Sequence, residues 1–215
     1  MTSAQTVASA SGRATANGTA PATTNVDATV PATLTPSRTA GTTLWLTGLP
    51  SAGKTTLALA LARMLRERGA DVEVLDGDEV RTHLSAGLGF TRQDRETQVT
   101  RIGYVAELLA RHGVIVIVPV IAPYQDARDK VRAHHESHGT AILQVHLSTP
   151  VEVCAERDVK GLYAKAFRGE ISAMTGVDDP YQIPVDPDLR IDTSTLDQET
   201  SVAALLGLLV ERGRL

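Results

Sequence analysis

Residues Thr43 to Leu65 read TLWLTGLPSAGKTTLALALARML, a short apolar run, a glycine-bounded loop and then an alanine- and leucine-rich segment. The loop from Gly48 to Thr55 matches the pattern G-x-x-x-x-G-K-[ST] at every position, and this pattern is typical of phosphate-binding loops. The apolar run predicts a strand before the loop, and the segment after it predicts a helix. The motif therefore has the flanking structure that it needs, and we expect this chain to bind a nucleoside triphosphate.

The residue types of this loop have a physical explanation. Glycines allow the backbone to curl so that successive N–H groups point at a polyphosphate, and the first turn of the next helix adds unpaired N–H groups and a positive dipole end. We expect Lys54 to neutralise charge on the β- and γ-phosphates and the Thr55 hydroxyl to hold Mg²⁺. The alternative is an ordinary strand–turn–helix corner. The predicted ATP-binding residues are Gly48, Leu49, Pro50, Ser51, Ala52, Gly53, Lys54, Thr55 and Thr56.

Composition limits the class of protein. The chain has 215 residues, of which 42% are hydrophobic, and this predicts a globular α/β domain with a sizeable core. The net charge of −4 argues against nucleic acid as a partner. No apolar run is long enough to span a membrane, so we expect no membrane partner and a cytoplasmic location. The single cysteine, Cys154, cannot form an internal disulfide. The six histidines show no convincing metal-ligand spacing and are interpreted as surface or core residues.

The composition changes at about residue 41. Residues 1–41 are dominated by Ala, Thr, Ser and Gly with few charges, which predicts a disordered tail; a transit peptide is the alternative. From residue 42 to residue 215, apolar runs alternate with helical segments. This alternation predicts an α/β fold of the P-loop NTPase type, with a parallel sheet and helices on both of its faces.

Five strands and five helices are predicted in this domain. The strands are expected at 43–47, 72–75, 114–119, 141–147 and 189–192, and the helices at 54–68, 92–112, 126–138, 150–157 and 197–212. Most of these strands are short and rich in Val and Ile, as expected for strands that are buried on both faces. In such a sheet, ligands bind at the carboxyl ends of the strands.

Two carboxylates follow the predicted strand at 72–75, in the sequence Asp76-Gly77-Asp78. One of them suits Mg²⁺, and the other suits a group that orients and deprotonates an attacking hydroxyl. The strand at 114–119 ends in proline and offers no acid, so Asp76 is the best candidate for the metal. Capping of the next helix by Asp78 is the alternative. The predicted catalytic residues are Lys54, Asp76 and Asp78, and the predicted metal ligands are Thr55 and Asp76.

Two further regions suggest contacts with a second substrate. Arg81 to Arg101 is a basic, polar stretch; arginines near a phosphate-transfer site often bind anions bidentately, although a solvated helix face explains the charges equally well. Within it, Phe90 is expected to stack on a base, with a hydrophobic staple as the alternative. Residues 158–181 form a long, glycine-punctuated segment that is typical of a lid. A lid excludes water from the phosphoryl transfer.

The chain strongly resembles the adenylylsulfate kinase family in segments that follow the phosphate loop in this order: LDGDEVR, GLGFTRQDR, RIGYVAELL, GVIVIVPVIAPYQDAR, PVEVCAERDVKGLYAKA and TGVDDPYQIP. The resemblance covers about residue 42 to the C-terminus. It implies a homodimeric P-loop kinase of sulfate assimilation. Such kinases use MgATP to phosphorylate the ribose 3′-hydroxyl of adenylylsulfate, giving 3′-phosphoadenylylsulfate and ADP.

The resemblance also assigns residues to this reaction. It implies that Asp76 and Asp78 serve Mg²⁺ and the acceptor hydroxyl, and that Lys160 contacts the anionic groups of the nucleotide. The acceptor-binding residues that it implies are Asp78, Arg81, Phe90, Arg95, Gln98, Ile121, Ala122, Lys160 and Met174.

The chain departs from the family pattern on or beside the expected acceptor pocket. The family motif D-R-x-E-N-I-R-R-I-G is DRETQVTRIG here, so that its glutamate is Thr97, its acceptor-binding asparagine is Gln98 and one arginine is Thr100. Ala122 takes the place of a serine that is a phosphoserine site in bacterial members. Since alanine has no hydroxyl, we expect direct in-line transfer.

Other departures concern the loop and the lid. Pro50-Ser51 replaces the usual Ser-Gly of the phosphate loop, Gln125 replaces an arginine, and Met174 replaces the lid phenylalanine that faces Phe90. The ATP side is nearly intact, whereas the acceptor side has changed. Three hypotheses follow: an adenylylsulfate kinase, a related kinase with another small hydroxyl acceptor, and a non-catalytic nucleotide-binding protein. Retention of the predicted catalytic residues argues against the third.

Overall fold

The computed structural model describes residues 41–215, so the predicted tail lies outside the described residues apart from Gly41. Its sheet contains five strands in the order β2-β3-β1-β4-β5, and every neighbouring pair is parallel. The strands are β1 (Thr42–Gly48), β2 (Val72–Val74), β3 (Ile115–Pro119), β4 (Ala141–Leu147) and β5 (Leu189–Ile191). The predicted parallel α/β fold is confirmed.

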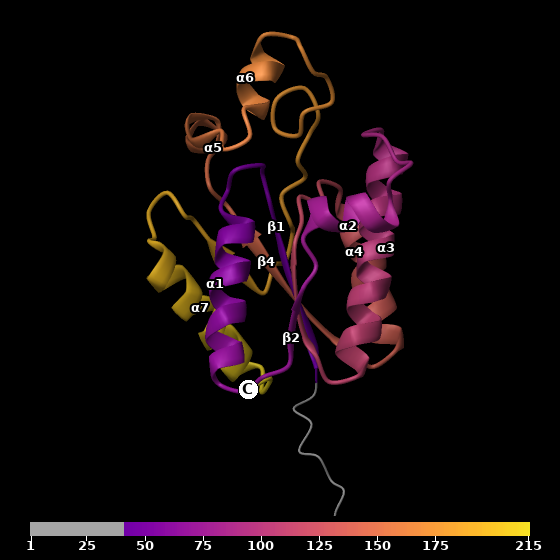
Figure 1. Ribbon diagram of the computed structural model, residues 1–215, viewed down its shortest axis with the longest axis vertical. Coiled ribbons are helices and arrows are strands. Elements are labelled where there is room, and N and C mark those ends of the chain that lie inside the picture. The colour runs from indigo at the N-terminus through magenta and orange to yellow at the C-terminus, as the bar shows by residue number, and fades with distance from the viewer. Residues whose placement is uncertain (1–40) are drawn as a thin grey trace, which may run out of the picture. The chain divides into compact units, whose positions relative to one another are not determined.

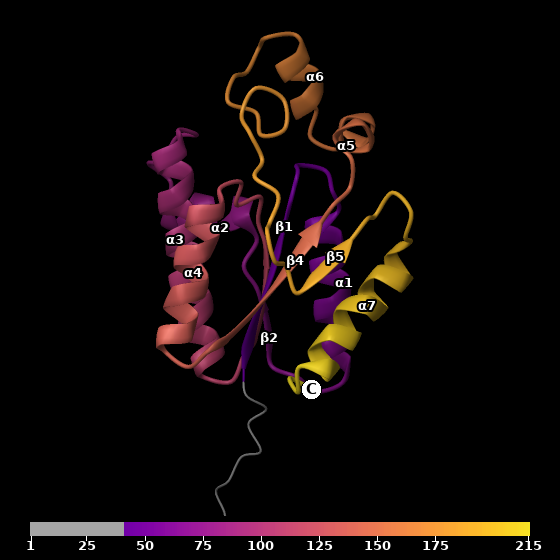
Figure 2. The same ribbon diagram turned by 180° about the vertical axis from the view of Figure 1, so that it is seen from behind.

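Helices cover both faces of this sheet. They are α1 (Lys54–Glu67), α2 (Gly77–Leu84), α3 (Arg92–Arg111), α4 (Gln125–Ser137), α5 (Val151–Arg157), α6 (Leu162–Phe167) and α7 (Gln198–Glu211). In Figures 1 and 2, α1 and α7 lie on one face, and α3 and α4 lie on the other. The short helices α5 and α6 project beyond the carboxyl ends of the strands (Figure 1). All five predicted helices are present, with ends within two residues of the expected ones.

Two helices were not predicted, and both are short. Helix α2 has eight residues, of which Val80 is the one buried residue, so its sequence lacks the apolar period that reveals a longer helix. Helix α6 has six residues and lies inside the predicted lid. A segment of this length offers too few turns for a periodic pattern.

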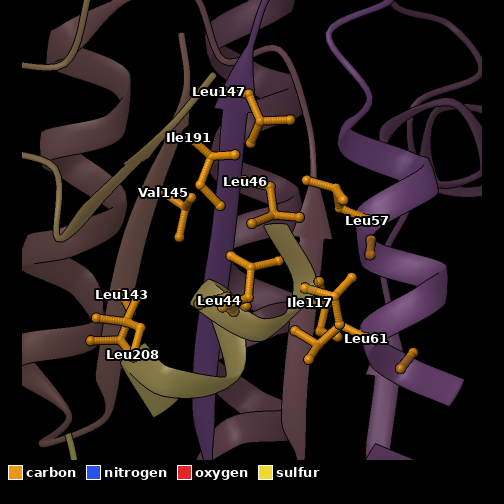
Figure 3. Packing of buried hydrophobic residues seen from close by; sticks show 14 of the residues in the cluster. Leu44, Leu46, Leu57, Leu61, Ile117, Leu143, Val145, Leu147, Ile191 and Leu208 are labelled. Atoms are coloured by element: carbon orange, nitrogen blue, oxygen red, sulfur yellow. The ribbon is translucent and has the colours of Figure 1, made fainter. Parts of the chain in front are cut away.

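The core consists of two clusters, one on each face of the sheet. Successive side chains of a strand point to opposite faces, so Leu44 and Leu46 of β1 pack toward α1 and α7, while Trp45 packs toward α3 and α4. Figure 3 shows Leu46 beside Leu57 of α1, and Leu44 near Ile117 of β3. Burying each such side chain contributes about 1.5–3 kcal/mol. All seven residues of β1 are buried, and this central strand therefore fixes the position of the loop that follows it.

The strand order places three loops side by side at one edge of the sheet. From β1 the chain first moves toward one edge of the sheet, where it forms β2 and β3. It then crosses to the opposite side of β1, where it forms β4 and β5. At such a reversal the loops diverge and leave a crevice at the carboxyl ends of the strands. The phosphate loop after β1, the acidic loop after β2 and the loop after β3 meet there.

Within residues 41–215, none of the helices has the length and apolar character that crossing a membrane requires.

Candidate active site

A cavity of about 890 Å³ opens at this edge of the sheet. Its wall brings together most of the residues predicted from the sequence, although they come from five different loops and from α1, α2 and α3. The predicted residues that line it are Pro50, Ser51, Gly53, Lys54, Thr55, Thr56, Asp76, Asp78, Arg81, Phe90, Arg95, Gln98, Ile121, Ala122 and Lys160. Gly48, Leu49, Ala52 and Met174 are not part of the wall.

The phosphate loop curls around the side chain of Lys54. Its Nζ donates hydrogen bonds to the carbonyl oxygens of Gly48 at 2.9 Å and Leu49 at 2.7 Å. Gly53 precedes α1 with a φ of 92°, in the left-handed region that glycine adopts without a steric cost. Lys54 is buried, and this desolvation lowers the pKa of its ammonium group to about 8. The lysine is therefore a cation that burial destabilises and that a nearby anion would stabilise.

Thr55 and Asp76 lie side by side at the floor of the cavity. The Thr55 hydroxyl donates to Asp76 Oδ2 at 2.7 Å, and Asp76 Oδ1 accepts from the backbone N–H of Asp78 at 2.9 Å. Asp76 is thus the N-cap of α2, whereas the sequence had suggested Asp78 as a possible cap. The cap belongs to Asp76 because its extended backbone precedes the helix, while Asp78 lies within the first turn.

The same two residues fit a magnesium ion. Mg²⁺ prefers oxygen ligands in octahedral geometry at about 2.0–2.1 Å, which places neighbouring ligand oxygens about 2.9 Å apart. Thr55 Oγ1 and Asp76 Oδ2 are already 2.7 Å apart. One hydroxyl and one carboxylate leave the remaining positions to water and to substrate phosphates, as Mg²⁺ sites in kinases usually do.

An exposed aromatic ring and two arginines form another part of the wall. Phe90 is 60% exposed, and the guanidinium groups of Arg81 and Arg95 lie 4.8 and 5.6 Å from the centre of its ring. Arg81 donates to the carbonyl of Gly89 at 2.9 Å, and Arg95 donates to the carbonyl of Phe90 at 2.9 Å. The arginines therefore hold the loop that presents Phe90, and both also face the cavity.

Gln98 lies deep in the cavity with half of its amide paired. Its Nε2 donates to the carbonyl of Gly77 at 3.1 Å, while its Oε1 is buried without a hydrogen-bond partner among the described residues. Nearby, Ala122 has a φ of 44° and is buried, and its carbonyl accepts a 2.6 Å hydrogen bond from Arg128. A buried, unpaired amide oxygen favours a ligand that brings a donor.

The predicted lid, residues 158–181, contributes one residue from the acceptor set to the wall. Lys160 forms an ion pair with Asp78 across the cavity. Met174 instead packs in the core cluster with 6% of its surface exposed, and its part in acceptor binding stays a prediction. The segment is tied to the domain by Arg95, which donates to the carbonyl of Ala173, and by Asp179, which accepts from the Tyr124 hydroxyl at 3.0 Å.

A further wall of the cavity was not predicted. It is formed by the last residue of α5, by residues after β5 and by the start of α7: Arg157, Thr193, Leu196, Asp197, Gln198 and Ser201. Thr193 joins this wall to the phosphate loop, because its hydroxyl donates to the carbonyl of Ala52 at 3.1 Å and accepts from Arg157 at 2.8 Å. The strand expected at 189–192 could have indicated this wall from the sequence, since ligands bind where parallel strands end.

Comparison with known proteins agrees with this geometry. A family model described as Adenylylsulphate kinase matches residues 40–192. The chain belongs to the adenylylsulphate kinase family. It is 51% identical over 177 residues to the adenylyl-sulfate kinase of Rippkaea orientalis, covering 81% of this chain and 94% of that protein. Identity to the enzyme of the same name from Myxococcus xanthus is 50% over 178 residues, covering 83% and 96%.

A solved structure of a family member has the same fold. The Mycobacterium tuberculosis APS kinase CysC in complex with AMPPNP and APS matches with a TM-score of 0.77 and 42% identity, covering 79% of this chain and 97% of that one. The family resemblance seen in the sequence is thus confirmed, and the adenylylsulphate kinase family accounts for nearly all of the described domain.

Proposed function

We propose that this protein is an adenylylsulfate kinase, which transfers the γ-phosphoryl group of MgATP to the ribose 3′-hydroxyl of adenylylsulfate. The observation that carries the proposal is the cavity itself. The phosphate loop with Lys54, the Thr55–Asp76 pair, and Phe90 with its two arginines all line this one cavity. Family membership supports the proposal, as does the complex of the mycobacterial relative with AMPPNP and APS.

The phosphate loop and Lys54 would bind the triphosphate. An incoming polyphosphate offers Lys54 anionic oxygens in place of the two loop carbonyls that it contacts now, and charge-assisted hydrogen bonds are the stronger ones. Thr55 and Asp76 would hold Mg²⁺, which neutralises charge on the β- and γ-phosphates. The N-terminus of α1 adds a positive dipole end to the same point.

Phe90 and the arginines would hold the acceptor. The exposed ring offers a face on which an adenine can stack, and Arg81 and Arg95 offer guanidinium donors to phosphate and sulfate oxygens. Gln98 Oε1 would accept a hydrogen bond from the bound acceptor, which removes an unpaired buried oxygen.

Asp78 is the candidate base for the acceptor hydroxyl. Its carboxylate lines the cavity and is paired with Lys160. In the reaction, the 3′-oxygen forms a bond to the γ-phosphorus, the bond from that phosphorus to the β–γ bridging oxygen breaks, and the hydroxyl proton passes to Asp78. Residue 122 is an alanine, so this proposal contains no phosphoenzyme intermediate at that position.

A second candidate is a family kinase with another hydroxyl acceptor. Two departures from the family pattern favour it. Gln98 leaves an unpaired buried oxygen in the pocket, and Met174 packs in the core and not in the cavity wall. Direct transfer from ATP is common to both candidates. Only the acceptor distinguishes them.

Turnover of adenylylsulfate, measured beside other small hydroxyl compounds by coupled ADP release and by detection of the phosphorylated product, tests the proposal. Adenylylsulfate is expected to give the highest kcat/KM, and Lys54→Ala is expected to abolish product formation. ADP release that is equal with and without adenylylsulfate would contradict the proposal. If Gln98→Asn combined with Met174→Phe raises adenylylsulfate turnover, the acceptor has drifted. The homodimer and the cytoplasmic location stay predictions, and sedimentation of the purified protein tests the first.

A further inference from the structure

Three residues with metal-binding side chains meet on the face of the sheet that α3 and α4 cover. Glu107 comes from α3, while His134 and His138 come from the end of α4, and one ligand atom of each lies within 4.8 Å of the others. Residues four apart lie on one face of a helix, so the two imidazoles stand together, with ring centres 4.5 Å apart. This cluster is far from the phosphate loop in sequence and is no part of the cavity.

Two atoms of this cluster are buried and face each other without a hydrogen bond. Glu107 Oε2 and His134 Nε2 are 3.8 Å apart. Within residues 41–215, neither atom has a hydrogen-bond partner. The Glu107 side chain is 1% exposed. Arg111 and Thr140 contact the other oxygen of this carboxylate, Oε1, so Oε2 is the buried atom that a bound cation could still neutralise.

The second polar atoms of two of these side chains, Glu107 and His138, have partners. Glu107 Oε1 accepts from the Thr140 hydroxyl at 3.0 Å, which orients the carboxylate. His138 Nδ1 lies 2.9 Å from the carbonyl oxygen of His134 and 3.1 Å from the Ser137 hydroxyl, and metal binding through Nε2 needs the tautomer in which Nδ1 carries the proton and donates it to that carbonyl. In that tautomer the Nε2 of His138 has a free lone pair. Metal-binding residues are commonly oriented by such contacts through their second polar atom.

We propose that Glu107, His134 and His138 form a binding site for a divalent transition-metal ion of the zinc class. Two imidazoles and a carboxylate suit such ions, with a fourth position left for water. Bonds of about 2.1 Å in a tetrahedron place neighbouring ligand atoms about 3.4 Å apart. Glu107 Oε2 and His134 Nε2 are 3.8 Å apart and the three ligand atoms lie within 4.8 Å of one another, so small side-chain rotations would bring them to a metal. Arg111 lies 3.6 Å from Oε1 and leaves Oε2 to the metal.

The position of the site indicates what the metal does. Glu107 lies nine residues beyond Gln98 on α3, or about 13 Å along the helix, toward the amino ends of the strands. A metal there would connect α3 to α4 and stabilise the domain without touching the substrates. The proposal replaces the interpretation of these histidines as ordinary residues. Their i, i+4 spacing was visible in the sequence, but their partner on α3 was not.

The alternative is that a proton, and not a metal ion, supplies the positive charge beside Glu107. A protonated His134 would form an ion pair with Glu107, and His138 would then have no part in it. The two explanations differ in whether His138 matters and in whether zinc binds with a fixed stoichiometry. Both differences can be measured on the intact chain.

The test is calorimetric titration of the chelator-treated full chain with ZnCl₂. Excess Mg²⁺ is kept present to occupy the oxygen ligands of the phosphate site. One Zn²⁺ per chain and a rise in Tm are expected, and CoCl₂ should give the visible absorption of a low-coordinate Co²⁺ site. Glu107→Gln and His138→Gln should each weaken Zn²⁺ binding at least 10-fold, whereas His83→Gln, which removes a histidine outside the cluster, should leave it within twofold.

The proposal is overturned if zinc does not bind, or if binding is unchanged in both cluster variants. It is also overturned if His83→Gln weakens binding as much as they do. His138 is exposed, so His138→Gln is expected to fold even if Glu107→Gln does not, and circular dichroism of each variant checks this.

Discussion

The ammonium group of Lys160 and the carboxylate of Asp78 form an ion pair that joins residues 158–181 to the first turn of α2. Both side chains are more than half exposed, and exposed pairs contribute at most about 1 kcal/mol. Lys160 can therefore leave Asp78 for the anionic group of a substrate at little cost. The same exchange frees Asp78 to accept a proton from an acceptor hydroxyl.

Replacing Lys160 by methionine is expected to reduce kcat/KM for adenylylsulfate by about 10- to 100-fold, because hydrogen bonds to charged groups contribute about 1.5–3 kcal/mol. The measurement is steady-state kinetics with adenylylsulfate varied at saturating MgATP. Lys165→Met is the matched control, since Lys165 belongs to the same segment and does not line the cavity. Equal losses in the two variants would show that the segment is merely perturbed.

The buried Lys54 predicts that MgATP binding weakens with rising pH. Burial lowers the pKa of Lys54 to about 8 in the free protein, whereas bound phosphates favour the charged form and raise that pKa again. Above pH 8, binding therefore requires the uptake of a proton. The Kd of MgATP is expected to increase about 10-fold from pH 7 to pH 9.

Isothermal titration of the protein with MgATP at both pH values checks this dependence. In Lys54→Arg, the guanidinium stays charged throughout this range, so the Kd of the variant should be weaker overall but nearly independent of pH. A wild-type Kd that stays constant from pH 7 to pH 9 would contradict the prediction, because it would mean that Lys54 keeps its charge in the free protein up to pH 9.

Features that depend on local sequence could be predicted. The motif from Gly48 to Thr55 forms the expected loop between β1 and α1, and the long helix predicted at 92–112 is α3, Arg92–Arg111. Loops that follow parallel strands must meet at one edge of the sheet. This rule is why the sequence could place Asp76 beside Thr55, which the structure has at 2.7 Å.

Features that depend on which segments meet in space could not be predicted. Thr193 reaches the carbonyl of Ala52 from a loop 141 residues later in the chain, and no local pattern signals that contact. Met174 occupies a lid position in the sequence but packs in the core. Glu107 faces His134 because α3 and α4 pack together. Each of these contacts follows from tertiary packing, on which local periodicity carries no information.

Phe90 is expected to stack on the adenine of the acceptor. Removing its ring in Phe90→Ala should raise the KM for adenylylsulfate by about 5- to 100-fold, since stacking of a base on an aromatic ring contributes about 1–3 kcal/mol. The KM for ATP should change little, because Phe90 belongs to the loop between α2 and α3 and not to the phosphate loop. Phe167→Ala is the control: this ring is 66% exposed, similar to the 60% of Phe90, but it lies on α6 and outside the cavity wall.

A parallel rise of the adenylylsulfate KM in both phenylalanine variants would refute the stacking role. If Phe90→Ala raised the KM for ATP alone, the ring would be assigned to the binding of ATP and not of adenylylsulfate.

The contact between α3 and α4 requires a glycine at position 103. A Cβ at Gly103 would lie 2.6 Å from Cγ2 and 2.9 Å from Cγ1 of Val131, so Gly103→Ala is expected to lower the free energy of unfolding by about 1–3 kcal/mol through overpacking. Gly207→Ala in α7 makes the same chemical change where no atom lies within 4 Å. There, alanine should stabilise the helix by about 0.5–1 kcal/mol. Urea unfolding followed by circular dichroism should therefore give changes of opposite sign, and a stabilised Gly103→Ala would mean that α4 can move away from α3 without loss.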